Sequence, residues 1–148
     1  MGFTHYFKHS RNIPQVKWDT FVKDVKLTLV GSEKTIQLDY DDTKPPLIDK
    51  DAVIFNGIEG CEDFYLTRKD QSELCKTARK PYDKYVVAVL MLAKMHFGTR
   101  IKFSSDGDPD DLIEGQSLML FHDQLNIKTE IVTKIVNGIT IVVEVNKL

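Results

Sequence analysis

The sequence contains few cysteines, and their spacing matches neither a metal site nor a disulfide framework. Cys61 and Cys75 show no CxxC pairing, and a small secreted domain stapled by disulfides needs more cysteines. The four histidines lack the HExxH pattern or any other paired spacing. We therefore expect a reduced, cytoplasmic protein with no metal site and no cofactor.

The sequence also lacks a long apolar run and a large net charge. Its longest apolar stretch, residues 85–93, is far shorter than the ~20 residues that span a bilayer. Residues 1–6 show no apolar segment of a secretory signal, so we expect no membrane association. Twenty basic and 22 acidic residues leave a formal charge of −2. No overall field attracts nucleic acid, which is not an expected partner.

Periodic patterns in the 148 residues predict one domain of the α+β class. Apolar and polar residues alternate over 3–8 as in a strand, whereas Trp18, Phe21 and Val25 follow helical spacing. We expect a mostly antiparallel mixed sheet with about three helices and one βαβ crossover. The expected strands are 3–8, 36–40, 52–56, 64–67, 73–78 and 100–104; the expected helices are 14–29, 82–97 and 109–125; and a polar loop is expected over 41–51.

The end of the chain carries a hairpin signal. Asn137 and Gly138 separate two β-rich runs, 130–136 and 139–145. Asn-Gly favours the tight turn that joins two paired strands. We therefore predict a C-terminal β-hairpin.

This hairpin, over 128–148, is expected to be appended to a domain of residues 1–127. With a two-residue turn, Ile141, Val143 and Val145 share one face of the hairpin, and its other face is also partly apolar. Two partly apolar faces indicate burial on both sides or contact with a partner. A homo-oligomer formed through the hairpin is therefore a hypothesis.

One βαβ unit is expected in the middle of the chain, from strand 73–78, helix 82–97 and strand 100–104. If both strands lie in one sheet, they run parallel and end at the same edge. Residues 76–80 and 104–107 would then lie together at the edge where ligands gather in open sheets. Whether the two strands are neighbours stays open.

These two stretches hold chemistry that suits an anion. Lys76, Arg79 and Lys80 supply positive charge, and an arginine grips a phosphate with two hydrogen bonds. The helix starts add backbone N–H donors. The alternative is structural, with the cations paired to Asp83 and Asp106. Four hydroxyl side chains could orient a sugar or base: Thr77, Tyr82, Ser104 and Ser105.

The acidic segment 106–111 has the composition of a calcium loop but not its pattern. Asp111 stands where an EF-hand needs glycine, and Ser117 stands where it needs a bidentate glutamate. Capping of a helix by Asp108 explains these acids better, so no metal is expected.

Three residues are candidates for acid–base or nucleophilic chemistry. His5 alternates with Phe3 and Phe7, so it is either a buried histidine with one partner or a general base. Asp106 is a second candidate base. Cys75 would be a nucleophile only if its thiolate were stabilised.

Several segments together resemble a family of phage and microbial proteins to which no activity is assigned. The segments that carry the resemblance are Gly2-Phe3-Thr4-His5-Tyr6, Trp18, Phe55-Asn56-Gly57, Cys75–Asp83 and Ser104–Gly107. The resemblance covers residues 1–125 and leaves the hairpin outside. It implies a phage-like origin and a single constellation: His5, Tyr6, Asn56, Lys76, Thr77, Arg79, Tyr82, Asp83, Ser105 and Asp106.

We therefore predict a protein that binds a small anionic ligand, namely a phosphate-bearing molecule such as a nucleotide or nucleotide-derived signal. Lys76, Arg79 and Lys80 hold the phosphate, and Tyr6 or Tyr82 stacks on a base. A phage product of this kind would sequester a host nucleotide.

Two alternatives remain open. The first is a metal-independent phosphoester or glycosidic hydrolase on the same site, with His5 or Asp106 as the base. The second is a structural or interaction module that uses the C-terminal hairpin.

Overall fold

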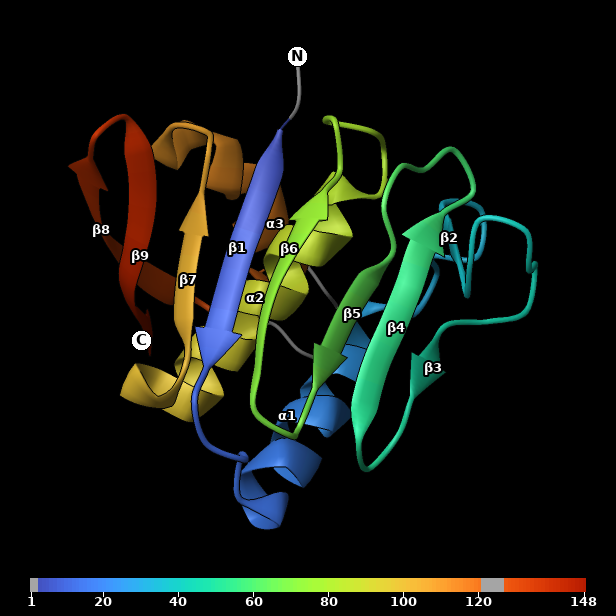
Figure 1. The fold of residues 1–148 in the computed structure, drawn as a ribbon, viewed down its shortest axis with the longest axis horizontal. Helices are drawn as coiled ribbons and strands as arrows, with labels where there is room; N and C mark the ends of the chain where they lie inside the picture. Colours follow the sequence, from blue (N-terminus) through green and yellow to red (C-terminus); the bar gives the residue numbers. More distant parts are fainter. Residues whose placement is uncertain (1–2, 121–126) are drawn as a thin grey trace.

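The computed structural model describes residues 3–120 and 127–148. Its architecture is the predicted α+β class, with antiparallel sheets on one side and helices on the other (Figure 1). The strands are β1 (Thr4–His9), β2 (Ile36–Gln37), β3 (Leu47–Ile48), β4 (Ala52–Gly57), β5 (Phe64–Thr67), β6 (Gln71–Lys76), β7 (Lys102–Ser105), β8 (Thr129–Val136) and β9 (Ile139–Lys147). The α-helices are α1 (Gln15–Thr28), α2 (Asp83–Phe97) and α3 (Ile113–Leu120), and two 3-10 turns are η1 (Gly98–Arg100) and η2 (Pro109–Leu112).

Five strands form the main sheet in the order β6-β1-β7-β9-β8, and each neighbouring pair is antiparallel. A second sheet has the order β2-β4-β3, with β5 paired to β4. β6 and β7 are not neighbours, because β1 lies between them. Both run antiparallel to β1 and therefore parallel to each other. The crossover through α2 thus spans one intervening strand.

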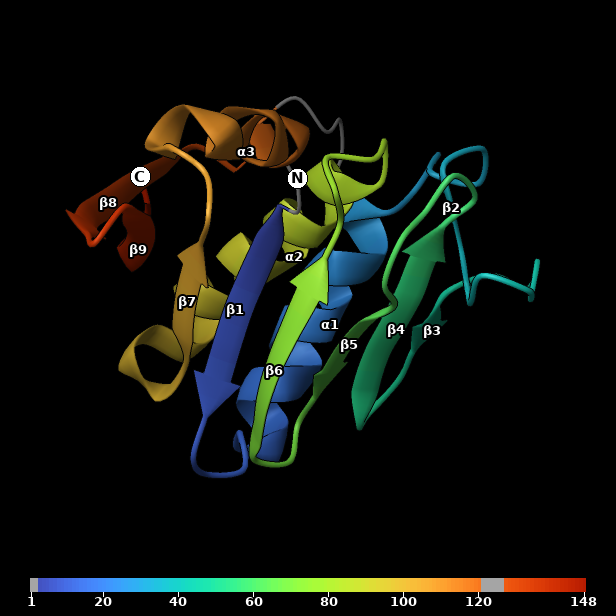
Figure 2. The same cartoon turned by 45° about the horizontal axis from the view of Figure 1, so that its top comes forward.

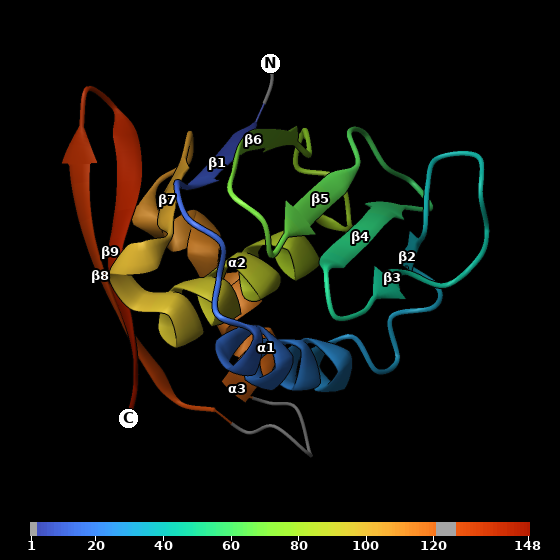
Figure 3. The same ribbon diagram turned by 60° about the horizontal axis from the view of Figure 1, so that its bottom comes forward.

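The core lies between the sheets and the helices α1 and α2, which cover one side of the strands (Figure 3). The Trp18 ring stacks on Phe97, with the ring centroids 6.0 Å apart. Apolar residues surround α2, so it is buried on nearly all sides. Lys94 is its buried cation, and its Nζ donates to the carbonyl oxygens of Gly98 and Ile101. In the described part of the chain, no helix is long and apolar enough to cross a membrane.

The predicted hairpin forms from β8 and β9. Asn137 and Gly138 have φ angles of 51° and 79°, the left-handed conformation that a type I′ turn requires at both central positions. β9 also pairs with β7, so the hairpin extends the main sheet.

A bulge in β9 changes which hairpin residues are buried. The register shifts between Val132 and Thr133, which leaves Val143 without a partner on β8. Val145 is 4% exposed and Val143 is 37% exposed. The prediction that these two valines share a face is therefore wrong, because the extra residue inverts the alternation.

Several element boundaries differ from the sequence-based expectation. The strands expected over 73–78 and 100–104 are Gln71–Lys76 and Lys102–Ser105, and two further differences affect the second sheet. The strand expected over 36–40 ends at Gln37, because the Leu38 amide bonds to the Lys44 carbonyl and the chain turns away. The loop expected over 41–51 contains the short strand β3, which pairs with β4.

The third helix begins with the 3-10 turn η2 and continues as α3. Asp108 and Asp111 form a capping box at its start, as the acidic segment indicated. The predicted end of this helix, residues 121–125, lies outside the described residues.

Candidate functional site

The two predicted segments do meet at one edge of the main sheet, with the start of β1 between them (Figure 2). The Phe3 carbonyl accepts a hydrogen bond from the Thr77 amide at 3.0 Å, just beyond β6. The Thr4 carbonyl accepts one from the Asp106 amide at 3.0 Å, just beyond β7. Residues 3–6 therefore belong to the site as much as the segments that flank them.

The alternation of β1 divides the predicted site between two faces of the sheet. His5 pairs with Cys75 and Ser105, and all three are buried on the face that packs against the helices. Tyr6 pairs instead with Leu74 on β6 and Ser104 on β7, on the opposite face. The residues that the resemblance groups together thus form separate sets.

The buried set is a chain of hydrogen bonds centred on His5. Its Nε2 lies 2.7 Å from Asp83 Oδ1, which also accepts a bond from the Thr77 hydroxyl at 2.5 Å. Its Nδ1 lies 2.6 Å from the Ser105 hydroxyl. Because a carboxylate only accepts, Nε2 carries a proton, and Nδ1 of a neutral ring accepts from Ser105.

This Ser-His-Asp chain has the composition of a catalytic triad without access for a substrate. His5 is 0% exposed and Ser105 is 1% exposed. The Phe3 ring packs edge-on against the imidazole, with the centroids 5.0 Å apart. The hydrogen bonds between these three side chains connect the start of α2 to β1 and β7. Their role in this conformation is to stabilise the fold.

The loop between β6 and α2 contains two residues with left-handed backbones. Ala78 and Arg79 have φ angles of 51° and 57°, which costs of order 1–3 kcal/mol for each such residue. The Arg79 guanidinium lies 4.0 Å from the Phe3 ring centroid and 2.7 Å from Asp111 Oδ1. Lys80 Nζ lies 3.9 Å from a Glu59 carboxylate oxygen. Two of the three predicted phosphate-binding cations therefore have acidic partners.

A cleft of about 350 Å³ lies beside this loop. Three cations and four acids line it, so the charge balance there does not favour an anion. The charged lining residues are Arg79, Lys80, Lys84, Asp83, Asp110, Asp111 and Glu114.

The Arg79–Asp111 pair predicts a pH-dependent contribution to stability. The Arg79 guanidinium holds the pKa of Asp111 below its ordinary value. Because the pKa of Asp111 is lower in the folded state than in the unfolded state, where it is about 3.9, its ionised form stabilises the fold above that pH. This stabilisation is lost as the pH falls through the pKa that Asp111 has in the folded state. Asp111→Asn should therefore lower the free energy of unfolding by about 0.5–1.5 kcal/mol at pH 7. The difference between variant and wild type should shrink at pH 3 in urea unfolding; an unchanged difference would contradict this account.

Asn56 and Tyr82, both predicted to contact a ligand, are buried braces of the loop after β4. The Asn56 amide donates to the Cys61 carbonyl at 3.1 Å and to Asp63 at 2.8 Å. The Tyr82 hydroxyl donates to the Glu62 carbonyl at 2.6 Å. These polar atoms bond within the protein.

Cys75 is a buried thiol, and the nucleophile hypothesis gains no support from its surroundings. Burial raises its pKa to about 12, so the thiol stays protonated at neutral pH. Cys61 is partly exposed. We expect a disulfide reagent at pH 8 to modify one thiol of the native protein and both thiols after denaturation. Rapid modification of both thiols in the native state would contradict this prediction.

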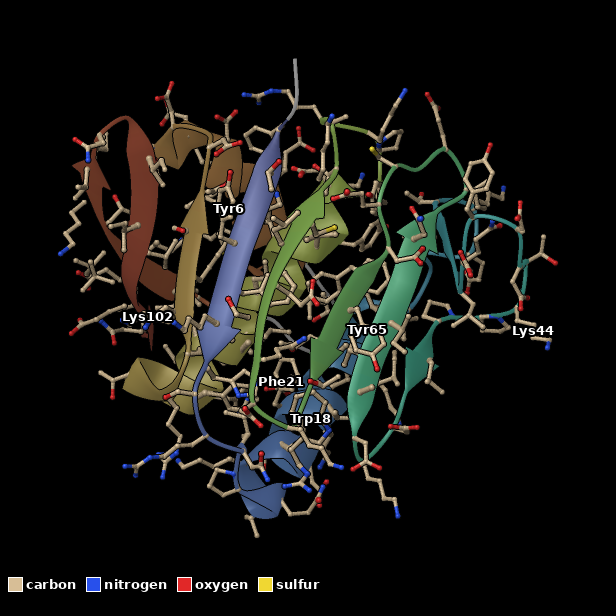
Figure 4. All side chains as sticks on the ribbon, in the orientation of Figure 1. Tyr6, Trp18, Phe21, Lys44, Tyr65 and Lys102 are labelled. Carbon is tan, nitrogen blue, oxygen red and sulfur yellow. The ribbon has the colours of Figure 1, made fainter. Side chains whose placement is uncertain are left out.

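The exposed set lies on the open face of the main sheet, the face away from the helices. Tyr6 and Lys8 alternate along β1 and pair with Ser104 and Lys102 on β7. Lys76 shares this face with them because it pairs with Thr4, two residues before Tyr6. Figure 4 shows Tyr6 beside the upper part of β1 and Lys102 at the lower end of β7. We call these five residues the open-face set.

A hollow of about 400 Å³ lies within this set and is lined by Tyr6, Phe7, Lys8, Ser72, Glu73, Leu74, Lys102 and Ser104. Lys8 and Lys102 are directly opposite each other on β1 and β7. Like charges in that position repel and destabilise a sheet. Among residues 3–120 and 127–148, neither lysine forms an ion pair.

Sequence reasoning missed Lys8 and Lys102 as candidate ligand residues. The period of two over residues 3–8 places Lys8 on the face of Tyr6, and the same period places Lys102 with Ser104. The sequence thus indicates the face of each lysine, but it shows that the two lysines are close together only when β1 and β7 are known to be neighbours.

Asp106, the second candidate base, is exposed at the end of β7, where its carboxylate accepts a hydrogen bond from the Thr4 amide at 3.2 Å. Partial burial raises the pKa of the Tyr6 hydroxyl, and the hydrogen bond to Asp106 raises it by a smaller amount. The phenol is therefore neutral at physiological pH and serves as a donor.

No protein-family model matches the chain, and neither a curated protein nor a solved structure matches it. Within the described ranges, no group of three or more histidine, cysteine, aspartate or glutamate residues could hold a metal ion.

Proposed function

We propose that this protein binds a phosphate-bearing small molecule, a nucleotide or nucleotide-derived signal, on the open face of its main sheet. The observation that carries the proposal is the directly opposed pair Lys8 and Lys102. Without an anion the two ammonium groups repel each other. A phosphate between them would replace this repulsion with charge-assisted hydrogen bonds.

The neighbours of the two lysines suit the rest of a nucleotide. Tyr6 and Ser104 form the next cross-strand pair in the same hollow. An aromatic ring can stack on a base, and a hydroxyl can bond to a sugar or base edge. Tyr6 and Ser104 thus keep the role predicted from the sequence, whereas Lys8 and Lys102 take the phosphate role assigned to Lys76, Arg79 and Lys80.

The arrangement favours binding over hydrolysis. His5 is the histidine of this region, and it lies on the opposite face of β1, buried between Ser105 and Asp83. A general base must reach the proton that it abstracts, directly or through one water. Sequestration of a nucleotide, as proposed for a phage-like protein, requires no such base.

A thermal-shift screen tests the proposal with nucleotides, cyclic nucleotides, NAD derivatives and sugar phosphates. A ligand at a hundredfold over its Kd should stabilise the wild type by about 2.7 kcal/mol. We expect Lys102→Gln to lose about half or more of this shift and Arg79→Gln to keep it. Loss in Arg79→Gln with retention in Lys102→Gln would place the ligand in the cleft beside α2 instead. No shift from any compound would overturn the proposal.

Self-association through the hairpin is a second candidate, because the edge strand β8 leaves apolar side chains in contact with solvent. Ile135 is 60% exposed and Val136 is 45% exposed, and an exposed apolar edge is a template for pairing. We propose that this edge joins two copies of the chain. Light scattering should then show a dimer that Ile135→Lys converts to a monomer; a monomeric wild type at high concentration would contradict it.

A further inference from the structure

The hollow between Lys8 and Lys102 continues across β7 into a second hollow of about 430 Å³. Lys102 and Ser104 line both hollows. The second one reaches β9 and β8, where it adds Lys134 and the apolar residues Ile141 and Val143. The bulge at Val143 lies at this place, where the register of the hairpin shifts.

Lysines outnumber acids on this extended surface. Glu73 is the one acid among the described lining residues of the first hollow. The second hollow is lined by Lys102, Lys134 and the hydrogen-bonded Lys94 of α2, and no acidic side chain is among its described lining residues. Within the described ranges, neither Lys102 nor Lys134 forms an ion pair. A chain with a net charge of −2 thus places Lys8, Lys102 and Lys134, none of them in an ion pair within the described ranges, on one face of its sheet.

Resting on the phosphate site at Lys8 and Lys102 in the proposed function, we infer that this face also binds a single strand of nucleic acid that crosses β1, β7, β9 and β8. One phosphate can contact both Lys8 and Lys102, which are on neighbouring strands. Lys134 is on β8, two strands beyond β7, and lies in the cross-strand row of Ser104 and Ile141, which is next to the row of Lys8 and Lys102 on the same face. The path from β1 to β8 covers about 14 Å across the strands, and a polymer with repeated phosphates can contact lysines spaced along it.

The side chains between the lysines favour binding of single-stranded over duplex nucleic acid. Tyr6, Leu74 and Ile141 lie in one cross-strand row through Ser104. Bases stack on aromatic side chains and contact apolar ones when they are not paired in a duplex. The total charge of the chain is near zero, and for that reason the sequence does not predict nucleic acid as a partner. The total charge does not show how unevenly the charged side chains are distributed over the faces of the protein.

Fluorescence anisotropy with labelled ten-residue oligothymidylate tests the inference. Two neutralised phosphates, one shared by Lys8 and Lys102 and one at Lys134, predict that log K falls with log salt with a slope of about −1.4, and Lys134→Gln should reduce the slope by about 0.7. Tyr6→Ala should weaken binding by roughly 5- to 150-fold for a single stacked base. Lys17→Gln, the same charge change on the exposed surface of α1, is the control and should leave affinity and slope unchanged.

The outcomes separate this inference from the proposed function. Suppose that mononucleotide binding depends on Lys102, and that oligonucleotide binding is no tighter and is unaffected by Lys134→Gln. This result overturns the inference and leaves the proposed function intact. Oligonucleotide binding that needs both lysines, without mononucleotide binding, supports the inference and removes the small-molecule proposal. Three results overturn the inference: the same affinity for duplex as for single-stranded nucleic acid, the same loss of affinity in Lys17→Gln as in Lys134→Gln, or no oligonucleotide binding at 50 mM salt.

Discussion

Replacing His5 with alanine is expected to lower the free energy of unfolding by about 3–5 kcal/mol. The substitution leaves a cavity beside the Phe3 ring, and buried large-to-small changes typically cost several kcal/mol. It also removes one hydrogen-bond partner of Asp83 and the side-chain partner of Ser105. The mostly buried Asp83 carboxylate then keeps only the hydrogen bond from the Thr77 hydroxyl, which adds to the loss.

Urea unfolding at pH 7 measures this effect, with Ser105→Ala as the matched control. That variant removes one hydrogen bond of the same chain and should cost only about 1 kcal/mol. Because small domains have about 5–15 kcal/mol of stability in total, the His5 variant should still fold at low temperature. A loss below about 1 kcal/mol in the His5 variant would show that the buried chain does not brace the sheet.

Lys102→Gln is expected to change free-protein stability and nucleotide affinity in opposite directions. Removing one of two directly opposed charges should stabilise the free protein by about 0.2–1 kcal/mol. Removing a charge-assisted contact should weaken nucleotide binding by about ten- to a hundredfold. Few other substitutions on an exposed strand would raise stability while weakening binding.

Thermal unfolding and calorimetric titration measure the two effects on the same preparation. Lys17→Gln is again the control, because it changes the charge of an exposed side chain on the helical side. Its stability and affinity should match the wild type. A Lys102 variant that is less stable and binds equally well would mean that the two lysines form no phosphate site.

The sequence predicts the elements whose signals are local. Pro81 and the apolar residues that follow determine α2, and Asn137-Gly138 determines the hairpin turn through two left-handed residues. The bulge at Val143 has no such signal, because it depends on how β9 pairs with β7 and β8. Register of this kind depends on the partner strand and not on the strand itself.

The candidate site was harder to predict, because its chemistry depends on contacts between distant residues. Lys76, Arg79 and Lys80 are adjacent in the chain, but Arg79 pairs with Asp111 and Lys76 shares the face of Tyr6. The decisive neighbours Lys8 and Lys102 come together only because β1 enters between β6 and β7. No local pattern encodes that insertion.

The central claim is that ligand binds on the open face, and a nitrogen–proton correlation spectrum of the labelled protein tests it most directly. Titration with AMP to millimolar concentration should shift the amide signals of residues 6–8 and 102–104 and leave those of 79–84 in place. The Lys102→Gln variant should need about ten- to a hundredfold more AMP for the same shifts. Shifts confined to 79–84 and 110–114, around the cleft beside α2, would contradict the account, as would an unchanged spectrum.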